Sequence, residues 1–306
     1  MDIEKVAIIV SKSRYELELE KYGSEERARE KYVPKLWENQ QRGHVDQKIN
    51  LAKISQHFYP HQIITDRINL TPALIEKYEA FVFLGGDDHF TYCSQAMLKY
   101  LQENKQAKKI VFGTVLDPKR SWGGQLDFTV DSFIDFFPRL QQDDYEIEKW
   151  TALEAVVQRG ETKSPPALAI NHFLVAETDR RDMSRNYVYL NGKEIFPDKS
   201  SGIIVAVGAG SGDGSWYDNV YGAVFQKADV LPRQTEYARI FLTENKSRSV
   251  ATLHTGEVLV IHSSNDSAGI VSPDSSKEKD REIPFPMGAA AEIKISSISL
   301  PVVRRK

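Results

Sequence analysis

The chain has 306 residues, of which 41% are hydrophobic and 27% are charged, and this balance is typical of a globular protein rather than a disordered one. The formal net charge of −3 gives no reason to expect nucleic acid or an anionic membrane as a partner. A single cysteine, Cys93, excludes an internal disulfide. The N-terminus lacks a signal-peptide pattern, and no apolar stretch is long enough for a transmembrane helix, so we expect a cytoplasmic protein.

Strands and helices alternate in the first half of the chain. Short apolar runs predict strands, and segments rich in helix-forming residues predict helices. The expected elements are a strand at Val6–Val10, helices at Tyr15–Tyr32 and Ile49–Phe58, a weak strand at Gln62–Thr65, a helix at Pro72–Tyr78, a strand at Phe81–Leu84, a helix at His89–Leu101 and a strand at Lys109–Val115. Alternation of this kind predicts an open, mostly parallel sheet with helices on its faces.

The second half consists mostly of short strand candidates separated by turns such as Asn191-Gly192. The expected strands are Leu153–Val157, Leu168–Val175, Tyr187–Leu190, Ile203–Val207, Val250–Leu253, Val258–Ile261 and Ile293–Ile295. We therefore expect a β-rich, largely antiparallel half.

A polar segment, Gln141–Asp144, is the expected boundary between these halves. It gives an α/β domain at residues 1–143 and a β-rich domain at residues 144–306, with the last segment expected to pack back on the first domain. Ser264–Arg281 is polar and rich in lysine, and we expect it to be a mobile surface loop.

The most informative motif is Gly85-Gly86-Asp87-Asp88, which follows the strand Phe81–Leu84 directly. Ligands bind at the carboxyl ends of strands in open α/β sheets, and glycines at such a position let a ligand approach the backbone. A carboxylate there can bind Mg²⁺ or accept a proton. A tight turn with a solvated acidic pair is the simpler alternative, and a Gly-Gly turn alone is a weak signal.

A second glycine-rich segment, Gly208-Ala209-Gly210-Ser211 with Gly212–Gly214 after it, also follows an apolar strand. Its third glycine falls at the wrong offset for the dinucleotide fingerprint. Its backbone N–H groups and the Ser211 hydroxyl can still contact a phosphate or a ribose. The alternative is a flexible loop.

Two further places complete the candidate site. Asn171-His172 lies inside a strand-like stretch, where an asparagine can read the edge of an adenine, although a lone histidine is more often structural. The segment Asp117–Gly124 follows another strand and carries Lys119 and Arg120, which suit nucleotide phosphates unless the segment is an ordinary solvated loop.

Together these segments favour nucleotide-dependent phosphoryl transfer, because that chemistry depends mainly on positioning and charge stabilisation. Histidine pairs or cysteine clusters with zinc spacing are missing from the sequence, as are a Walker A motif and a G-x-S-x-G elbow.

These motifs resemble those of the NAD kinase family, and most closely its mitochondrial-type branch. Gly85-Gly86-Asp87 stands where the family has Gly-Gly-Asp-Gly, and Asn171 stands where it has Asn-Glu. The segment Lys199–Gly202 followed by Gly208–Ser211 resembles the Ser-Ser-Gly strand and glycine loop of that branch. Further similar segments are Lys12–Glu16, Asp117–Ser121, Ser184-Arg185, Asp274 and Ile283–Gly288.

The resemblance implies an NAD kinase/diacylglycerol kinase-like fold and a homo-oligomer, either a homodimer or a homotetramer. It implies that ATP, with Mg²⁺, phosphorylates the 2′-hydroxyl of the adenosine ribose of NAD. Asp87 would be the catalytic base, Asn171 would hold the dinucleotide, and Gly208, Ala209, Gly210 and Ser211 would line ribose and phosphate.

The other positions implied for the nucleotide are Gly85, Gly86, Asp88, His89 and His172. Asp87 and Asp88 are the expected metal ligands. The expected phosphate contacts are Lys12, Arg14, Lys119, Arg120 and Arg185.

Four positions depart from the family pattern. Asp88 and His89 replace the usual glycine and threonine, His172 replaces glutamate, and Ala209 replaces threonine. Asp88 can repel a phosphate or supply a second metal ligand. These departures leave two alternatives open: a related kinase with another hydroxyl acceptor, and a catalytically inactive nucleotide-binding homologue.

Overall fold

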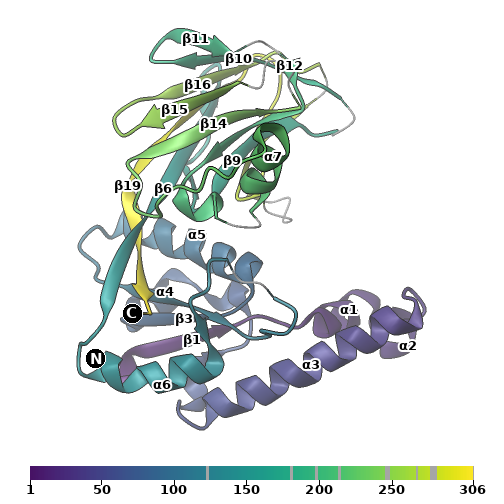
Figure 1. The fold of residues 1–306 in the computed structure, drawn as a ribbon, viewed down its shortest axis with the longest axis vertical. Helices are drawn as coiled ribbons and strands as arrows, with labels where there is room; N and C mark the ends of the chain where they lie inside the picture. Colours follow the sequence, from purple (N-terminus) through teal and green to yellow (C-terminus); the bar gives the residue numbers. More distant parts are fainter. Residues whose placement is uncertain are drawn as a thin grey trace. The chain divides into compact units, whose positions relative to one another are not determined.

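The computed structural model describes residues 1–121, 124–179, 182–196, 199–212, 215–244, 249–266, 268–275 and 281–305 (Figure 1). The chain forms two compact units. The first comprises Met1–Tyr100, Asn104–Ile147 and Pro301–Lys306, and the second comprises Leu101–Glu103 and Glu148–Leu300. The predicted fold class is confirmed, since a parallel α/β part is joined to an antiparallel β-rich part.

The first unit is built on a parallel sheet. Its strands are β1 (Val6–Val10), β2 (Ile63–Ile64), β3 (Ala80–Gly85), β4 (Ile110–Val115) and β5 (Phe128–Thr129). Their order is β2-β1-β3-β4, and β5 and the end of β19 (Ala290–Arg304) pair in parallel with β4. Every residue of β1, β3 and β4 is buried, as expected for strands covered on both faces.

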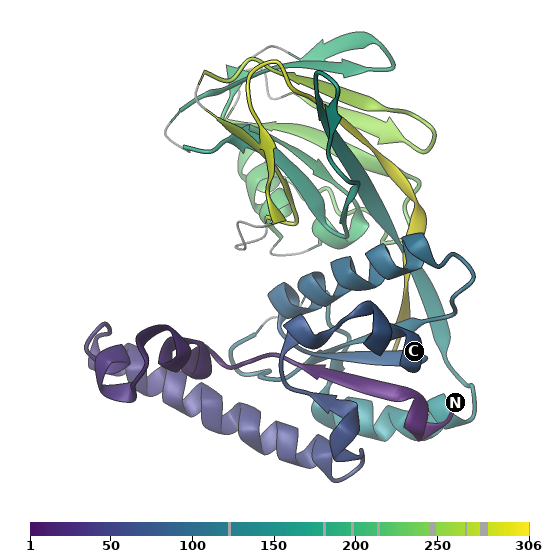
Figure 2. The same cartoon turned by 180° about the vertical axis from the view of Figure 1, so that it is seen from behind.

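Among the described residues, six α-helices lie in the first unit. They are α1 (Arg14–Tyr22), α2 (Glu25–Arg29), α3 (Pro34–Ser55), α4 (Pro72–Lys77), α5 (Asp87–Glu103) and α6 (Val130–Gln141), apart from the last three residues of α5, Leu101–Glu103, which fall in the second unit. Short 3₁₀ turns lie at η1 (Ile3–Lys5), η2 (Pro60–Gln62) and η3 (Arg67–Asn69). Figure 2 shows α5 on one face of the sheet and α6 on the other. Among the described helices, none combines the length and apolar character needed to cross a lipid bilayer.

The predicted bounds of two helices are wrong. The segment Tyr15–Tyr32 is not one helix, because Gly23 adopts a left-handed φ of 77° and ends α1, and the Ser24 side chain then caps α2. The predicted helix Ile49–Phe58 overlaps only the last part of α3, which begins at Pro34 and ends at Ser55. Helix α6 was not predicted.

The second unit is antiparallel. One sheet is ordered β15 (Val250–His254), β14 (Tyr237–Thr243), β13 (Gly202–Ala206), β9 (His172–Glu177), β17 (Gly269–Pro273) and β18 (Ile283–Phe285). The other strands are β6 (Glu146–Arg159), β7 (Thr162–Lys163), β8 (Ala167–Ala169), β10 (Ser184–Leu190), β11 (Lys193–Phe196), β12 (Lys199–Ser200), β16 (Leu259–Ser263) and most of β19. Helix α7 (Trp216–Phe225) packs against the six-stranded sheet, and η4 (Gly208–Gly210) is a 3₁₀ turn.

The predicted single strand Leu168–Val175 is wrong, because β8 and β9 are separate strands that pair with different partners. The Asp274 carboxylate lies at the break and accepts hydrogen bonds from the backbone N–H groups of Ile170, Asn171 and His172, at 3.1, 2.7 and 3.1 Å. This side chain therefore supplies the bonds that a continuous strand would have made with a neighbouring strand.

The prediction of a mobile loop at Ser264–Arg281 is wrong for its middle part. Gly269–Pro273 forms β17, which is hydrogen-bonded between β9 and β18. Ser267 and residues 276–280 lie outside the described residues. Strand β14 and helix α7 were also not predicted.

Phe133 is the centre of the aromatic core of the first unit. Its fully buried ring lies 5.4 Å from the ring of Phe112 and 6.1 Å from that of Phe128. We expect Phe133→Ala to lower the free energy of unfolding by about 3–5 kcal/mol, because it leaves a cavity in this cluster. Phe137→Ala, one turn later on α6 at a half-buried position, is the matched control and should cost clearly less. Urea unfolding of both variants tests this, and equal losses would contradict it.

Candidate functional site

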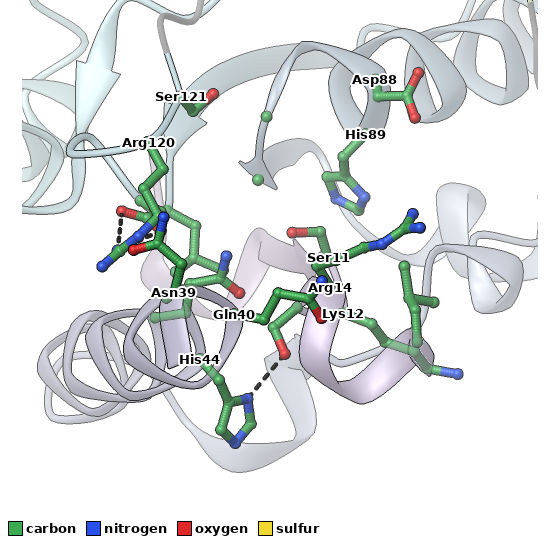
Figure 3. Close-up of a pocket in the computed structure, with 18 of the residues that line it drawn as sticks. Ser11, Lys12, Arg14, Asn39, Gln40, His44, Asp88, His89, Arg120 and Ser121 are labelled. Carbon is green, nitrogen blue, oxygen red and sulfur yellow. Dashed lines mark hydrogen bonds and ion pairs between the residues drawn. The ribbon is translucent and has the colours of Figure 1, made fainter. Parts of the chain in front are cut away.

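A pocket of about 570 Å³ lies in the first unit at the carboxyl ends of the parallel strands (Figure 3). Its walls come from the β1–α1 turn, α3, the start of η3, the β3–α5 turn and the segment after β4. The chain leaves β1 on one side to form β2 and returns to its other side to form β3. The pocket therefore adjoins the point where the strand order reverses, which is where open α/β sheets bind ligands.

Gly85 allows the ends of β1 and β3 to meet at this pocket. A Cβ atom at Gly85 would lie 2.8 Å from both Ser11 Oγ and His89 Cβ, which is closer than such atoms approach. Helix α5 then begins at Asp87 with Gly86 as its N-cap, and no side chain caps it. The glycine pair therefore brings an uncapped helix N-terminus, with its partial positive charge, to the edge of the pocket.

Asp87 points to the segment after β4, and it is not among the residues that line the pocket. Its two carboxylate oxygens accept hydrogen bonds from the backbone N–H groups of Gly124 and Gln125, each at 3.1 Å. The hydroxyl of Thr91, on α5, donates to Gln125 Oε1 at 3.1 Å and ties this segment to the helix. Burial raises the pKa of Asp87 above its usual value, the two N–H groups oppose the rise, and the charge of Asp88 adds to it.

Asp88 and His89 both line the pocket but differ in exposure. Asp88 is exposed, whereas His89 is 3% exposed. His89 Nε2 lies 2.9 Å from the carbonyl oxygen of Ile9, which can only accept, so Nε2 carries the hydrogen of the neutral ring. His89 Nδ1 is buried and has no hydrogen-bond partner among the described residues. Burial lowers the pKa of His89 to about 4.

The predicted phosphate contacts near this pocket all lie in ion pairs. Lys12 Nζ lies 2.7 Å from Asp66 Oδ2, and Arg14 lies 2.7 Å from Glu18. Arg120 lies 2.8 Å from Asp46 and 3.0 Å from Asp117. Lys119, which does not line the pocket, lies 3.1 Å from Asp46. Lys12, Arg14 and Arg120, which line the pocket, are thus already held by carboxylates, and an anionic ligand would have to compete with those carboxylates.

Sequence reasoning missed the wall that α3 contributes. Residues of α3 that line the pocket are spaced three or four apart and lie on one face of the helix: Leu36, Asn39, Gln40, Gly43, His44 and Gln47. Their spacing is a visible signal, but it becomes readable only once the helix is known to begin at Pro34. Ser13, at the N-cap of α1, joins this wall through its hydroxyl, 2.8 Å from His44 Nδ1.

The remaining predicted site residues belong to the second unit. Asn171 meets the glycine segment directly, since its carbonyl oxygen accepts the Val207 N–H at 3.0 Å. A Cβ on Gly210 would lie 2.2 Å from that same oxygen, and one on Gly208 would lie 2.1 Å from Pro232 O. The glycines of this segment are therefore required by tight backbone packing. Asp213 and Gly214 lie outside the described residues.

Two of the predicted site residues of the second unit, Ser211 and His172, are engaged within the protein. Ser211 is fully buried, donates to Gly208 O at 3.0 Å and accepts the Leu231 N–H at 2.7 Å. His172 Nε2 lies 2.7 Å from Ser275 Oγ, and its ring meets the Trp216 ring edge to face at 5.6 Å. Burial lowers the pKa of His172 to about 4.

Arg185, the last of the predicted phosphate contacts, belongs to β10. Its guanidinium group forms an ion pair with Asp266 at 2.7 Å. The first unit thus collects Lys12, Arg14, Gly85, Gly86, Asp88, His89 and Arg120 at one pocket. The second unit brings Asn171 into contact with the Gly208–Ser211 segment.

No model of a known protein family matches the chain, and a search of curated proteins finds no match. Among solved structures, a crystal structure of yeast NADH kinase complexed with NADH is similar over 100% of this chain and 85% of that chain. The TM-score is 0.67 and the sequence identity is 13%. At this identity the similarity shows a shared, NAD kinase-like fold.

The tight packing of the second glycine segment can be tested by substitution. We expect Gly208→Ala and Gly210→Ala each to lower the free energy of unfolding by at least about 2 kcal/mol, because the added methyl group meets backbone atoms that cannot give way. Gly212→Ala is the matched control, since nothing lies within 4 Å of its Cβ position, and should change stability by less than about 0.5 kcal/mol. Similar melting temperatures for all three variants would refute the packing argument.

The lowered pKa of His89 predicts a pH dependence of stability. Between pH 6.5 and about 4 the unfolded histidine binds a proton that the folded one does not, so stability is full above about pH 6.5 and falls as the pH drops toward 4. The lowered pKa of His172 likewise reduces stability as the pH falls. The raised pKa of Asp87 has the opposite effect on stability. We expect His89→Gln to lose less stability than the native protein between pH 6.5 and 4, measured by urea unfolding. Parallel curves for the two proteins would contradict this.

Proposed function

We propose that this protein is an NAD kinase-like phosphotransferase, which transfers the terminal phosphoryl group of ATP to the 2′-hydroxyl of the adenosine ribose of NAD. The observation that carries the proposal is the position of Asp87. It begins a helix at the carboxyl edge of a parallel sheet, next to a polar pocket, in a fold shared with yeast NADH kinase.

The pocket suits the phosphates of a nucleotide. The N-terminus of α5 has no side-chain cap, so its first N–H groups can bind an anion, and the helix dipole favours negative charge there. Lys12, from the β1–α1 turn, and Arg14, the first residue of α1, line the same pocket. Both are held in ion pairs that fix their positions before a phosphate arrives.

Asp87 is placed to act as the base. Two backbone N–H groups fix its carboxylate, so it loses little freedom when it accepts a proton. Its raised pKa moves it toward the range in which a general base is effective. In the proposed step the proton of the 2′-hydroxyl moves to Asp87, the hydroxyl oxygen bonds to the terminal phosphorus, and the bond from that phosphorus to the leaving ADP oxygen breaks.

The described residues hold no group of three or more histidine, cysteine, aspartate or glutamate side chains that could bind a metal. Magnesium does not require one, because it is usually held by one or two carboxylates together with substrate phosphates. Asp88 is exposed in the pocket and fits such a role, next to Asp87. When bound, Mg²⁺ would neutralise charge on the transferred phosphoryl group.

For the dinucleotide, we propose Asn171 and His172 together with the Gly208–Ser211 segment. Support comes from the close approach of Asn171 to Val207 and Gly210, and from the ring of Trp216 beside His172. The homo-oligomer, the cytoplasmic location and the similarity to the mitochondrial-type branch stay predictions.

One observation favours a second candidate function. Asp88 is an exposed carboxylate in the pocket at a position where the resembled family has glycine, and it repels phosphate unless a cation screens it. This favours a related kinase with a different hydroxyl acceptor, or a homologue that binds nucleotide without catalysis.

Product analysis by mass spectrometry after incubation with ATP, Mg²⁺ and NAD tests the proposal. We expect NADP from the native protein and a loss of at least about 100-fold in its rate with Asp87→Asn, because the amide cannot accept the proton. Asp131→Asn, at an exposed aspartate in the first turn of α6, is the matched control and should leave the rate unchanged.

The other outcomes would change either the proposed function or the role of Asp87. A phosphorylated product from another hydroxyl compound, with none from NAD, would replace the proposed acceptor. Thermal stabilisation by ATP or NAD without any product would identify a binding protein. NADP formation that survives Asp87→Asn would remove Asp87 from the role of base.

A further inference from the structure

The wall that α3 gives to the pocket is polar where a packing surface would be apolar. We define the α3 pocket face as Leu36, Asn39, Gln40, Gly43, His44 and Gln47. Helices of globular proteins normally direct apolar residues at such a spacing toward the protein. On this face, four of the six residues carry amide or imidazole groups, which recognise ligands by hydrogen bonds.

Gln40 provides the first evidence that this face binds a ligand. Its Oε1 atom is buried and has no hydrogen-bond partner among the described residues. Buried polar atoms in folded proteins are nearly always paired, so an exception calls for an explanation. A bound molecule that donates a hydrogen bond would supply one.

His89 gives the second sign, independently of α3. It belongs to α5, and Figure 3 shows it across the pocket from Asn39 and Gln40. Its Nδ1 atom is a buried acceptor without a partner among the described residues, because Nε2 is engaged with the carbonyl of Ile9. Two elements of the first unit thus present unsatisfied acceptors at one pocket.

The two turns that border the pocket call for an anion. The uncapped N-terminus of α5 and the side chains of Lys12 and Arg14 lie at the β1–α1 and β3–α5 turns. A ligand that satisfies the pocket carries phosphate toward these two turns and hydrogen-bond donors toward α3 and His89. A nucleotide meets both requirements, and its size suits a pocket of about 570 Å³.

The carboxamides select among nucleobases. An Asn or Gln side chain presents one acceptor and one donor side by side, which matches the amino group and ring nitrogen of adenine. The corresponding edge of guanine presents two acceptors and is matched by arginine or lysine instead. Gln40 and Asn39 therefore favour adenine over guanine when the base is bound through the edge that carries N7.

We propose that the α3 pocket face recognises the adenine of an adenine nucleotide whose phosphates lie toward Gly85 and Gly86. The inference rests on the proposed function for the use made of that nucleotide, which is either the donor ATP or the dinucleotide NAD. Gln40 and Asn39 are specificity-determining residues in this assignment, and Gly43 keeps the middle of the helix face free of side chain.

Isothermal titration calorimetry with the full chain tests the assignment. The ligands are ATP, GTP, NAD, nicotinamide mononucleotide and inorganic triphosphate. We expect ATP to bind at least about tenfold more tightly than GTP, and Gln40→Leu and Asn39→Leu each to weaken ATP binding by about tenfold and to remove the preference over GTP. Competition between ATP and NAD shows which of the two supplies the adenine.

Gln41→Leu is the matched control. Gln41 is the next residue on the helix, does not line the pocket, and donates to Glu25 Oε1 at 2.8 Å. Its variant should bind ATP like the native protein. Thermal melts of all three variants will show whether each is folded. If Gln40→Leu does not fold, Asn39→Leu still tests the assignment, because Asn39 is exposed.

Several results would overturn the assignment. One is an unchanged preference for ATP over GTP in both Gln40→Leu and Asn39→Leu. Another is binding of inorganic triphosphate as tight as that of ATP, and a third is no binding of any adenine nucleotide. The proposed function fails separately: ATP binding that depends on Gln40, without NADP formation, would retain the adenine site and reject the kinase. NADP formation by Gln40→Leu with an unchanged KM for ATP and NAD would retain the kinase and reject the adenine site.

Discussion

The close approach of β1 and β3 at Gly85 is the constraint on which the candidate site depends. Only a residue without a Cβ leaves room there for Ser11 and His89 at once. The approach allows the Ser11 N–H to bond to Leu84 O and places the N-terminus of α5 beside the turn that follows β1. The pocket, the orientation of Asp87 and the burial of His89 all follow from this contact between the ends of two strands.

Burial gives the groups around that contact their chemical character. Asp87 is half-buried and held by two N–H groups, so its carboxylate is oriented while its pKa is raised. His89 is kept neutral by burial, and its free nitrogen becomes an acceptor instead of a cation. Lys12, Arg14 and Arg120 are held in ion pairs with Asp66, Glu18 and Asp117. The pocket thus combines fixed charges with unsatisfied polar atoms, which are features of a binding site more than of a packed core.

Much of the fold was predictable from local patterns. Fully apolar runs at Val6–Val10 and Phe81–Leu84 are short, rich in branched or aromatic residues and end in polar or glycine residues, so they could be read as buried parallel strands. Local patterns failed to predict elements that depend on contacts with distant parts of the chain. The break between β8 and β9 depends on Asp274, about a hundred residues away, and a polar surrounding sequence concealed β17, whose pairing comes from β9 and β18.

For the site, the sequence alone determined the residue types and the chemistry they permit: a carboxylate after a glycine pair at a strand end, with cations on neighbouring turns. Only the tertiary structure decided which of them meet. It placed Asp87 outside the lining of the pocket, paired Lys12, Arg14 and Arg120 with carboxylates, and added the α3 pocket face. The physical reason is that a residue's type limits the bonds it can make, whereas burial and partners depend on segments that are far apart in the chain.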